Sequence, residues 1–380
     1  MNHFHKNFNY VRFTKIKGIY LFSYFLLRQV LVCAQPSPLN MESLFTPPQQ
    51  YITPFTSEAP KIDGNVNEEI WQSAAWTNYF MDIEGTTHAK PTWNTRVKML
   101  WNDTCLFVAA ELQEPHVWAT LKKHDAIIYH DNDFEIFIDP DNDTHHYYEI
   151  EVNAYNTIFD LFMTKPYRNN GRALISWQVA RLRSGVQVQG TLNNPNDTDK
   201  GWTVEMAIPL RMLAINSKPI PPAEGTTWRI NFSRVQWDVA IQQGKYVKKT
   251  GANGKPLPEH NWVWSPQGLI NMHYPERWGY LYFTRKAALQ DSAFSLPYAE
   301  KQKQQLWRLY YRQKEYFQKH GQYAKDLTDL GVNNNQVKIE NQVNQLKLEA
   351  NTHQFMAFIQ EADKIIYCIN QDGLIQTCKN

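Results

Sequence analysis

Two neighbouring segments of this chain alternate polar and apolar residues with a period of two. Residues 131–139 read Asp-Asn-Asp-Phe-Glu-Ile-Phe-Ile-Asp, and residues 147–153 read Tyr-Tyr-Glu-Ile-Glu-Val-Asn. This period places successive side chains on opposite faces of a strand, so it predicts two β-strands. The connection between them, residues 140–146, can close the two strands symmetrically into an antiparallel pair.

Each predicted strand has one apolar face and one acidic face. The apolar side chains are Phe134, Ile136 and Ile138 in the first strand, and Tyr148, Ile150 and Val152 in the second. On the other face, a symmetrical closure of the pair places Glu135 opposite Glu151, with Glu149 on the same side. Directly opposed like charges repel, so a cation, a shared proton or ligand hydroxyl groups must compensate them. The acidic face is therefore the leading candidate for a binding site.

The rest of residues 58–284 has the strand spacing of an all-β protein. Further strands are predicted at 96–101, 106–112, 158–163, 176–182, 186–192, 202–208, 228–232 and 279–283, and a long loop at 240–260. The sequence has no βαβ rhythm, no Gly-rich phosphate loop and no Gly-x-Ser-x-Gly motif. These features predict an antiparallel β-sandwich of the jelly-roll type.

Composition changes after about residue 285, and residues 285–380 are predicted to form a small α+β appendage. One helical face is expected in 300–320, formed by Leu306, Leu309, Tyr310, Tyr316 and Phe317. A closing hairpin is expected around a turn at 371–373. Cys368 and Cys378 flank this turn, so we expect a disulfide across the hairpin if the protein is exported. Cys105, in a predicted strand, is expected to be a buried free thiol.

The N-terminal residues have the pattern of an export signal. Residues 1–34 combine basic residues, a short apolar run at 18–27 and a small-residue cleavage site, and residues 35–57 follow as a leader or linker. We expect a secreted or periplasmic protein with no stable membrane span after signal removal. Residues 1–34 hold five of the 39 Lys and Arg residues and no acid, so their removal changes the formal net charge from +2 to −3. Such a charge gives no electrostatic reason to bind nucleic acid.

The loop between the two acidic strands is a candidate metal site. Asp139, Asp141 and Asp143 place carboxylates at alternate positions, and calcium prefers arrays of oxygen ligands. We therefore expect calcium as a structural ion. No organic cofactor is expected.

Six segments of the chain together resemble the family 9 carbohydrate-binding modules of secreted bacterial proteins. They match in order and spacing over about residues 58–284. The segments are 60–71, 97–110, 132–139, 201–210, 228–232 and 277–281.

The resemblance implies a β-sandwich that binds poly- or oligosaccharides and works with a glycan-degrading partner. Members of the family hold a terminal sugar between two aromatic rings, beside a strand carboxylate that accepts hydroxyl hydrogen bonds. By this resemblance Glu135 is the acceptor and Tyr129 the first ring, with Trp262 or Trp264 as substitutes for the second. Glu151 falls where the family has a basic residue.

Two alternatives remain open. The first is a glycoside hydrolase in which Glu135 and Glu151 are the catalytic pair, since such enzymes need two carboxylates at a defined separation. The second is a haem-binding redox sandwich with axial ligands drawn from Met163, Met272 and His273. A module that binds sugar without catalysing a reaction is the preferred hypothesis.

Overall fold

The computed structural model describes residues 45–214, 220–286, 295–362 and 364–379. These residues belong to one compact unit, Leu39–Asn380. The predicted signal sequence, residues 1–34, lies outside the described residues.

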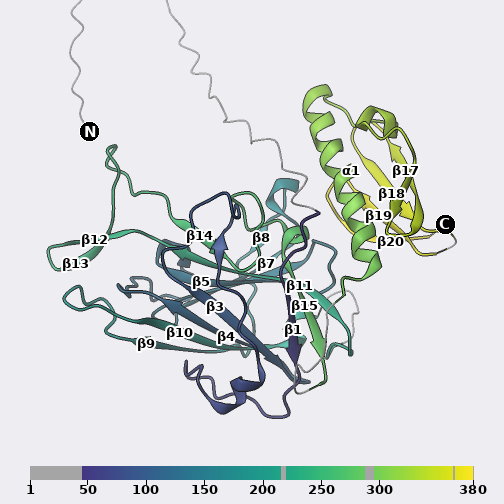
Figure 1. Cartoon of the computed structure of the whole chain (residues 1–380). Coiled ribbons are helices and arrows are strands. Elements are labelled where there is room, and N and C mark those ends of the chain that lie inside the picture. Colours follow the sequence, from purple (N-terminus) through teal and green to yellow (C-terminus); the bar gives the residue numbers. More distant parts are fainter. Residues whose placement is uncertain (1–44, 215–219, 287–294, 363, 380) are drawn as a thin grey trace, which may run out of the picture. The chain divides into compact units, whose positions relative to one another are not determined.

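The larger sheet carries the two acidic strands near its centre (Figure 1). Its main order is β1-β15-β11-β5-β6-β7-β8, and β14 and β2 join it beside β11. The strands are β1 (Gln50–Pro54), β2 (Met81–Asp82), β5 (Asp133–Asp139), β6 (Tyr147–Asn153), β7 (Ile158–Met163), β8 (Ala173–Leu174), β11 (Thr227–Gln236), β14 (His260–Val263) and β15 (Gly279–Thr284).

A second sheet faces the first and completes the sandwich. Its order is β3-β4-β10-β9, with β3 (Thr95–Trp101), β4 (Cys105–Gln113), β10 (Gly201–Pro209) and β9 (Arg183–Gln189). The predicted apolar faces of β5 and β6 enter the shared core, where Ile136 and Ile150 join Val108 and Val204 of the second sheet. The predicted β-sandwich is confirmed.

Three local predictions differ from the structure. Residues 176–182 form turns rather than a strand, because their amides bond locally or to a side chain, as Val179 N–H does to Asp160 Oδ2. Gln50–Pro54, expected in the leader, pairs in parallel with β15. The expected loop at 240–260 contains a hairpin of β12 (Val239–Gln242) and β13 (Lys245–Lys248).

The C-terminal residues form the predicted α+β appendage. Helix α1 (Tyr298–His320) packs on a five-stranded antiparallel sheet of β16 (Gln336–Ile339), β17 (Gln342–Ala350), β18 (Phe355–Gln360), β19 (Ile366–Asn370) and β20 (Ile375–Cys378). The sheet is larger than the hairpin expected from the sequence. Cys368 and Cys378 form a disulfide between β19 and β20. Cys105 is a free thiol, half-buried rather than buried.

Short 3-10 helices fill several connections. They are η2 (Glu69–Ser73), η3 (Ile128–His130), η4 (Tyr167–Asn169), η5 (Leu210–Leu213), η6 (Pro275–Arg277) and η7 (Leu327–Leu330). η4 is also bonded to the appendage, since Tyr310 OH donates to Asn169 Oδ1 at 2.8 Å. Within the described residues, no helix is both long and apolar enough to cross a membrane.

Candidate functional site

The strand pairing brings the predicted acidic residues together on the outer face of the larger sheet. Glu135 of β5 lies directly opposite Glu151 of β6, so the predicted register is confirmed. Asp133 lies two residues before Glu135 on the same face. One carboxylate oxygen from each of Asp133, Glu135 and Glu151 lies within 4.8 Å of the others. Glu149 follows on β6 and completes a group of four, here called the acidic cluster.

The acidic cluster is much more buried than a solvated strand face would be. Its members expose between 0% (Asp133) and 6% (Glu149) of their surface. The outer face of the sheet is covered because a second apolar group packs on it, built from Ile83, Ile128, Phe137, Tyr147, Phe159, Leu161, Met163, Val263, Met272 and Trp278. The carboxylates therefore lie among apolar side chains, since Glu149 pairs with Phe137 and Leu161 and Glu151 with Phe159, and charge is costly there unless it is compensated.

Burial raises the pKa of every carboxyl group in the acidic cluster. It raises the pKa of Glu135 to about 7, although the Ser233 hydroxyl opposes the shift. Burial, followed by the charge of Glu135, raises the pKa of Glu149 to about 8. The same two causes raise the pKa of Asp133 and that of Glu151 well above the ordinary range. Four groups that resist ionisation side by side are typical of a functional site.

Two exposed phenol rings lie close to the acidic cluster. Tyr129 in η3 is 39% exposed, and its backbone N–H donates to Glu151 Oε2 at 3.2 Å. Tyr167 in η4 is 46% exposed, and burial followed by the charges of Glu149 and Glu151 raises its pKa. The sequence predicts a binding role for Tyr129 but gives no such prediction for Tyr167. The only sequence signal for Tyr167 is its place in a Pro- and Gly-bounded turn directly after β7.

His273 connects the Tyr167 ring to the acidic cluster. Its ring centroid lies 4.5 Å from that of Tyr167, its Nδ1 is hydrogen-bonded to Tyr147 OH at 2.9 Å, and its Nε2 lies 3.9 Å from Glu149 Oε2. Burial, followed by the charge of Arg168, lowers the pKa of His273 to about 4. The imidazole is therefore neutral near pH 7 and does not compensate the carboxylates.

The three residues considered as haem ligands have other structural roles. The Met272 sulfur accepts a hydrogen bond from Gln267 Nε2 at 3.1 Å, and Met163 is fully buried in the apolar layer. His273 is held by Tyr147. These contacts give no indication that any of the three residues is an axial haem ligand, so the haem hypothesis gains no support.

The aspartates of the connecting loop converge as well. One oxygen from each of Asp139, Asp141 and Asp143 lies within 4.8 Å of the others. Asp139 is fully buried and accepts bonds from the N–H groups of Asn142 and Thr144, at 3.1 and 2.9 Å. The loop can fold this tightly because Asn142, Thr144 and His146 take left-handed backbone conformations.

Comparison with known proteins identifies the segment that carries both acidic groups. Residues 62–246 match the model of a family described as "Carbohydrate family 9 binding domain-like". This segment is a family 9-like carbohydrate-binding domain. The resemblance predicted from the sequence is thus confirmed.

Two long polysaccharide-degrading enzymes are similar to part of this chain. The chain is 26% identical over 151 residues to endo-1,4-beta-xylanase C of Paenibacillus barcinonensis, covering 40% of this chain and 12% of the xylanase. It is 31% identical over 103 residues to exoglucanase XynX of Acetivibrio thermocellus, covering 27% of this chain and 8% of the exoglucanase. The match thus spans about a tenth of each enzyme.

Solved structures with some similarity were also found. A family 9 carbohydrate-binding module of Caldicellulosiruptor kristjanssonii in complex with cellotriose is 17% identical, with a TM-score of 0.39, covering 66% of this chain and all of that one. A putative carbohydrate-binding protein from Bacteroides uniformis is 16% identical, with a TM-score of 0.46, covering 62% of this chain and 99% of that one.

Trp262 and Trp264 were predicted as stacking rings of the family 9-like domain, and the structure contradicts this. They are only 3% and 2% exposed and belong to the core between the sheets. β14 pairs with β11, which places Trp262 beside the buried guanidinium of Arg234, 5.3 Å from its ring centroid. Trp264 packs on Phe232. Because stacking on a sugar needs an accessible ring face, neither indole can serve as a surface platform in this conformation.

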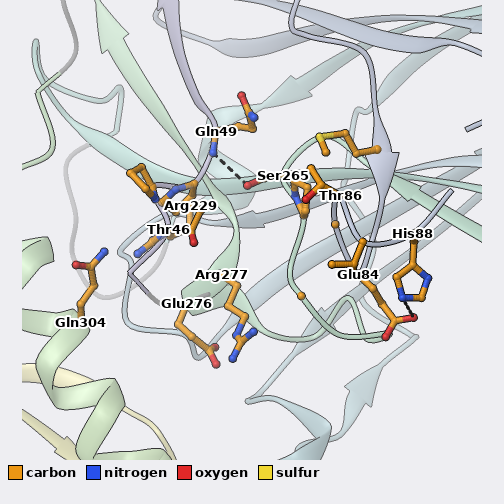
Figure 2. A pocket seen from close by; sticks show the side chains of 17 residues that line it. Thr46, Gln49, Glu84, Thr86, His88, Arg229, Ser265, Glu276, Arg277 and Gln304 are labelled. Carbon is orange, nitrogen blue, oxygen red and sulfur yellow. Dashed lines mark hydrogen bonds and ion pairs between the residues drawn. The ribbon is translucent and has the colours of Figure 1, made fainter. Parts of the chain in front are cut away.

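A cavity of about 530 Å³ lies elsewhere on the described part of the protein (Figure 2). Glu276 and Arg277 lie on one side of it, Glu84 and the His88 ring, 3.4 Å from the Glu84 carboxylate, on another, and Gln304 of α1 also borders it. None of its described lining residues is Phe, Tyr or Trp, and none belongs to either acidic group. Because it offers no stacking surface, we do not assign it to sugar binding.

Proposed function

We propose that the family 9-like domain binds carbohydrate on the outer face of its larger sheet. The observation that carries the proposal is the combination of the acidic cluster with two exposed phenol rings, Tyr129 and Tyr167. Sugar rings present C–H faces that stack on aromatics and hydroxyl groups that donate to carboxylates. Glu135, Glu149 and Glu151 would accept these hydroxyl bonds through the 3–6% of their surface that stays exposed, whereas a stacking ring would need a whole open face. Tyr167 would take the stacking role that was predicted for Trp262 or Trp264.

The proposed sugar binding suggests a biological role in polysaccharide breakdown. We propose that the protein is secreted or periplasmic and serves polysaccharide breakdown through a glycan-degrading partner. The matched part of the chain is related to segments of a xylanase and an exoglucanase, which supports this setting.

A binding screen with the full chain tests the proposal. Xylan, cellulose and other soluble polysaccharides are tested by affinity electrophoresis and calorimetry, while the release of reducing ends is measured in parallel. We expect binding to at least one polysaccharide without release of product. Product release that disappears in Glu135→Gln would instead favour the hydrolase. Absence of binding to any glycan would contradict sugar recognition.

The first prediction concerns Glu135. In Glu135→Gln we expect about tenfold weaker sugar affinity, since a hydrogen bond to a charged acceptor contributes about 1.5–3 kcal/mol. In the metal-free protein the melting temperature should not fall, because the change removes one of several mutually repelling carboxylates. Calorimetry and thermal melts measure both quantities. Glu349→Gln, on the exposed surface of β17, is the matched control and should change neither. Unchanged affinity in Glu135→Gln would exclude the assigned role.

We also propose that Asp139, Asp141 and Asp143 hold a structural calcium ion. These residues fit a calcium ion because their three carboxylates converge. In the same loop, the buried Asn142 Oδ1 has no hydrogen-bond partner and is a further oxygen that could bind the ion. The nearby Lys303 ammonium is engaged by Glu300 at 2.7 Å. When bound, the ion would neutralise the loop charge and hold its fold.

The second prediction follows from this calcium site. Calcium at about one hundred times its dissociation constant should stabilise the native protein by about 2.7 kcal/mol per site. Chelation should therefore lower the melting temperature by several degrees. In Asp141→Asn, chelation should lower the melting temperature by less than in wild type, because the loop no longer binds calcium. A melting curve of wild type that does not respond to chelator would contradict the proposal.

A further inference from the structure

We propose that Asp133, Glu135 and Glu151 bind a second calcium ion on the outer face of the larger sheet, and that this ion takes part in holding the sugar. The first half of this inference depends only on the geometry of the three carboxylates. The second half rests on the proposed function.

The three carboxylates have the arrangement of a preformed ligand set. They come from two adjacent strands, and one oxygen of each lies within 4.8 Å of the other two. Asp133 is fully buried, and its Oδ1 accepts a bond from Val235 N–H at 3.0 Å. Its Oδ2 is buried and has no hydrogen-bond partner. A carboxylate oxygen without a partner in the protein interior is costly, so its position needs a ligand.

No basic side chain compensates these charges in the part of the chain that the structure describes. None of the three carboxylates forms an ion pair there with Lys, Arg or His. Arg234 lies near enough to Asp133 to interact with its charge, but it is bound to Glu114 at 2.9 Å. The closest histidine contact in the cluster is that of His273 with Glu149, and this imidazole is neutral near pH 7. A divalent cation supplies the missing positive charge.

The donor set favours calcium. All three ligands are hard carboxylate oxygens, the Ser233 hydroxyl lies directly across from Glu135, and neither thiolate nor imidazole is present among the three. Calcium takes about six to eight oxygen ligands at about 2.3–2.6 Å. Three side chains leave coordination positions open, and adjacent hydroxyls of a sugar are oxygen ligands of the required kind. Tyr129 and Tyr167 are both exposed near these carboxylates, since the Tyr129 N–H donates to Glu151 and the charge of Glu151 acts on the Tyr167 hydroxyl, and their rings would hold such a sugar by stacking.

Calcium titration of the full chain, with and without sugar, tests the inference. The experiment uses the Asp141→Asn variant, in which the loop site is removed. This protein is freed of metal with chelator and then titrated with calcium chloride by calorimetry. We expect Asp141→Asn to bind one calcium ion. The double variant Asp141→Asn with Asp133→Asn should bind none. Asparagine preserves the acceptor for Val235 N–H and the side-chain shape. The melting temperature of Asp133→Asn checks that it folds.

The sugar measurement separates this inference from the proposed function. With both halves correct, sugar affinity of wild type falls at least tenfold in chelator and returns on adding calcium, whereas Asp133→Asn shows no such response. Calcium binding at Asp133 without any sugar binding would support the ion and contradict the proposed function. Equal sugar affinity with and without calcium, together with no calcium site lost in Asp133→Asn, would overturn the inference and leave sugar recognition standing.

Discussion

Removing both exposed phenol rings, in the double variant Tyr129→Ala and Tyr167→Ala, should weaken sugar binding about a hundredfold. Each ring contributes about 1–1.5 kcal/mol through stacking, and about 2.8 kcal/mol in total corresponds to a factor of about one hundred in the dissociation constant. Each single variant should lose about tenfold. The melting temperature should change little, because both rings are more than a third exposed. Calorimetry against a polysaccharide that wild type binds provides the measurement.

The chain offers a matched control for this experiment. Tyr79 is 51% exposed and contacts Arg96 by a cation–π interaction on another part of the domain. Tyr79→Ala removes the same chemical group and should leave sugar affinity unchanged. A double variant that binds as tightly as wild type would show that the acidic cluster is not flanked by stacking rings. If Tyr129→Ala weakens sugar binding but Tyr167→Ala does not, Tyr167 is not part of the site.

Arg234→Met should destabilise the sandwich by about 3–5 kcal/mol. Arg234 is fully buried, and its guanidinium donates to Glu114, Thr95 and Gln236 at 2.6–3.0 Å. Methionine fills much of the volume but leaves Glu114, 2% exposed, without its cation. Removing one partner of a buried ion pair has a cost of this size because the other charge stays desolvated. Thermal and denaturant unfolding should both show the loss.

Two further variants identify the cause. Arg96→Met breaks the partly exposed ion pair with Glu111 and should cost less than about 1 kcal/mol. Replacing both buried partners, in Arg234→Met with Glu114→Gln, should recover part of the lost stability, since no unpaired charge then remains. If Arg234→Met were as stable as wild type, the ion pair would not contribute to the fold.

The local pattern of the sequence was sufficient for the sandwich and for the position of its acidic residues. The period of two in β5 and β6 defined the apolar faces that enter the core, and the short connection gave the pairing of Glu135 with Glu151. Helix α1 followed in the same way from its apolar spacing. Such features depend on residues close together in the chain, so they can be predicted without knowing which distant segments pack on them.

The surroundings of the acidic residues could not be predicted in this way. The apolar layer that buries them brings Ile83, Met272 and Trp278 onto β5–β7 from distant parts of the chain. Likewise, no local pattern distinguishes the exposed ring of Tyr167 from the buried ring of Trp262. Both are aromatic residues near turns, and only the pairing of β14 with β11 places the indole inside.

The amino-acid sequence by itself therefore determined the fold class, the faces of the central strands and the charge that those faces carry. The tertiary structure alone decided how deeply that charge is buried and which rings remain accessible beside it. The physical reason is that strand period and register are properties of neighbouring residues, whereas burial depends on which distant segments cover a face.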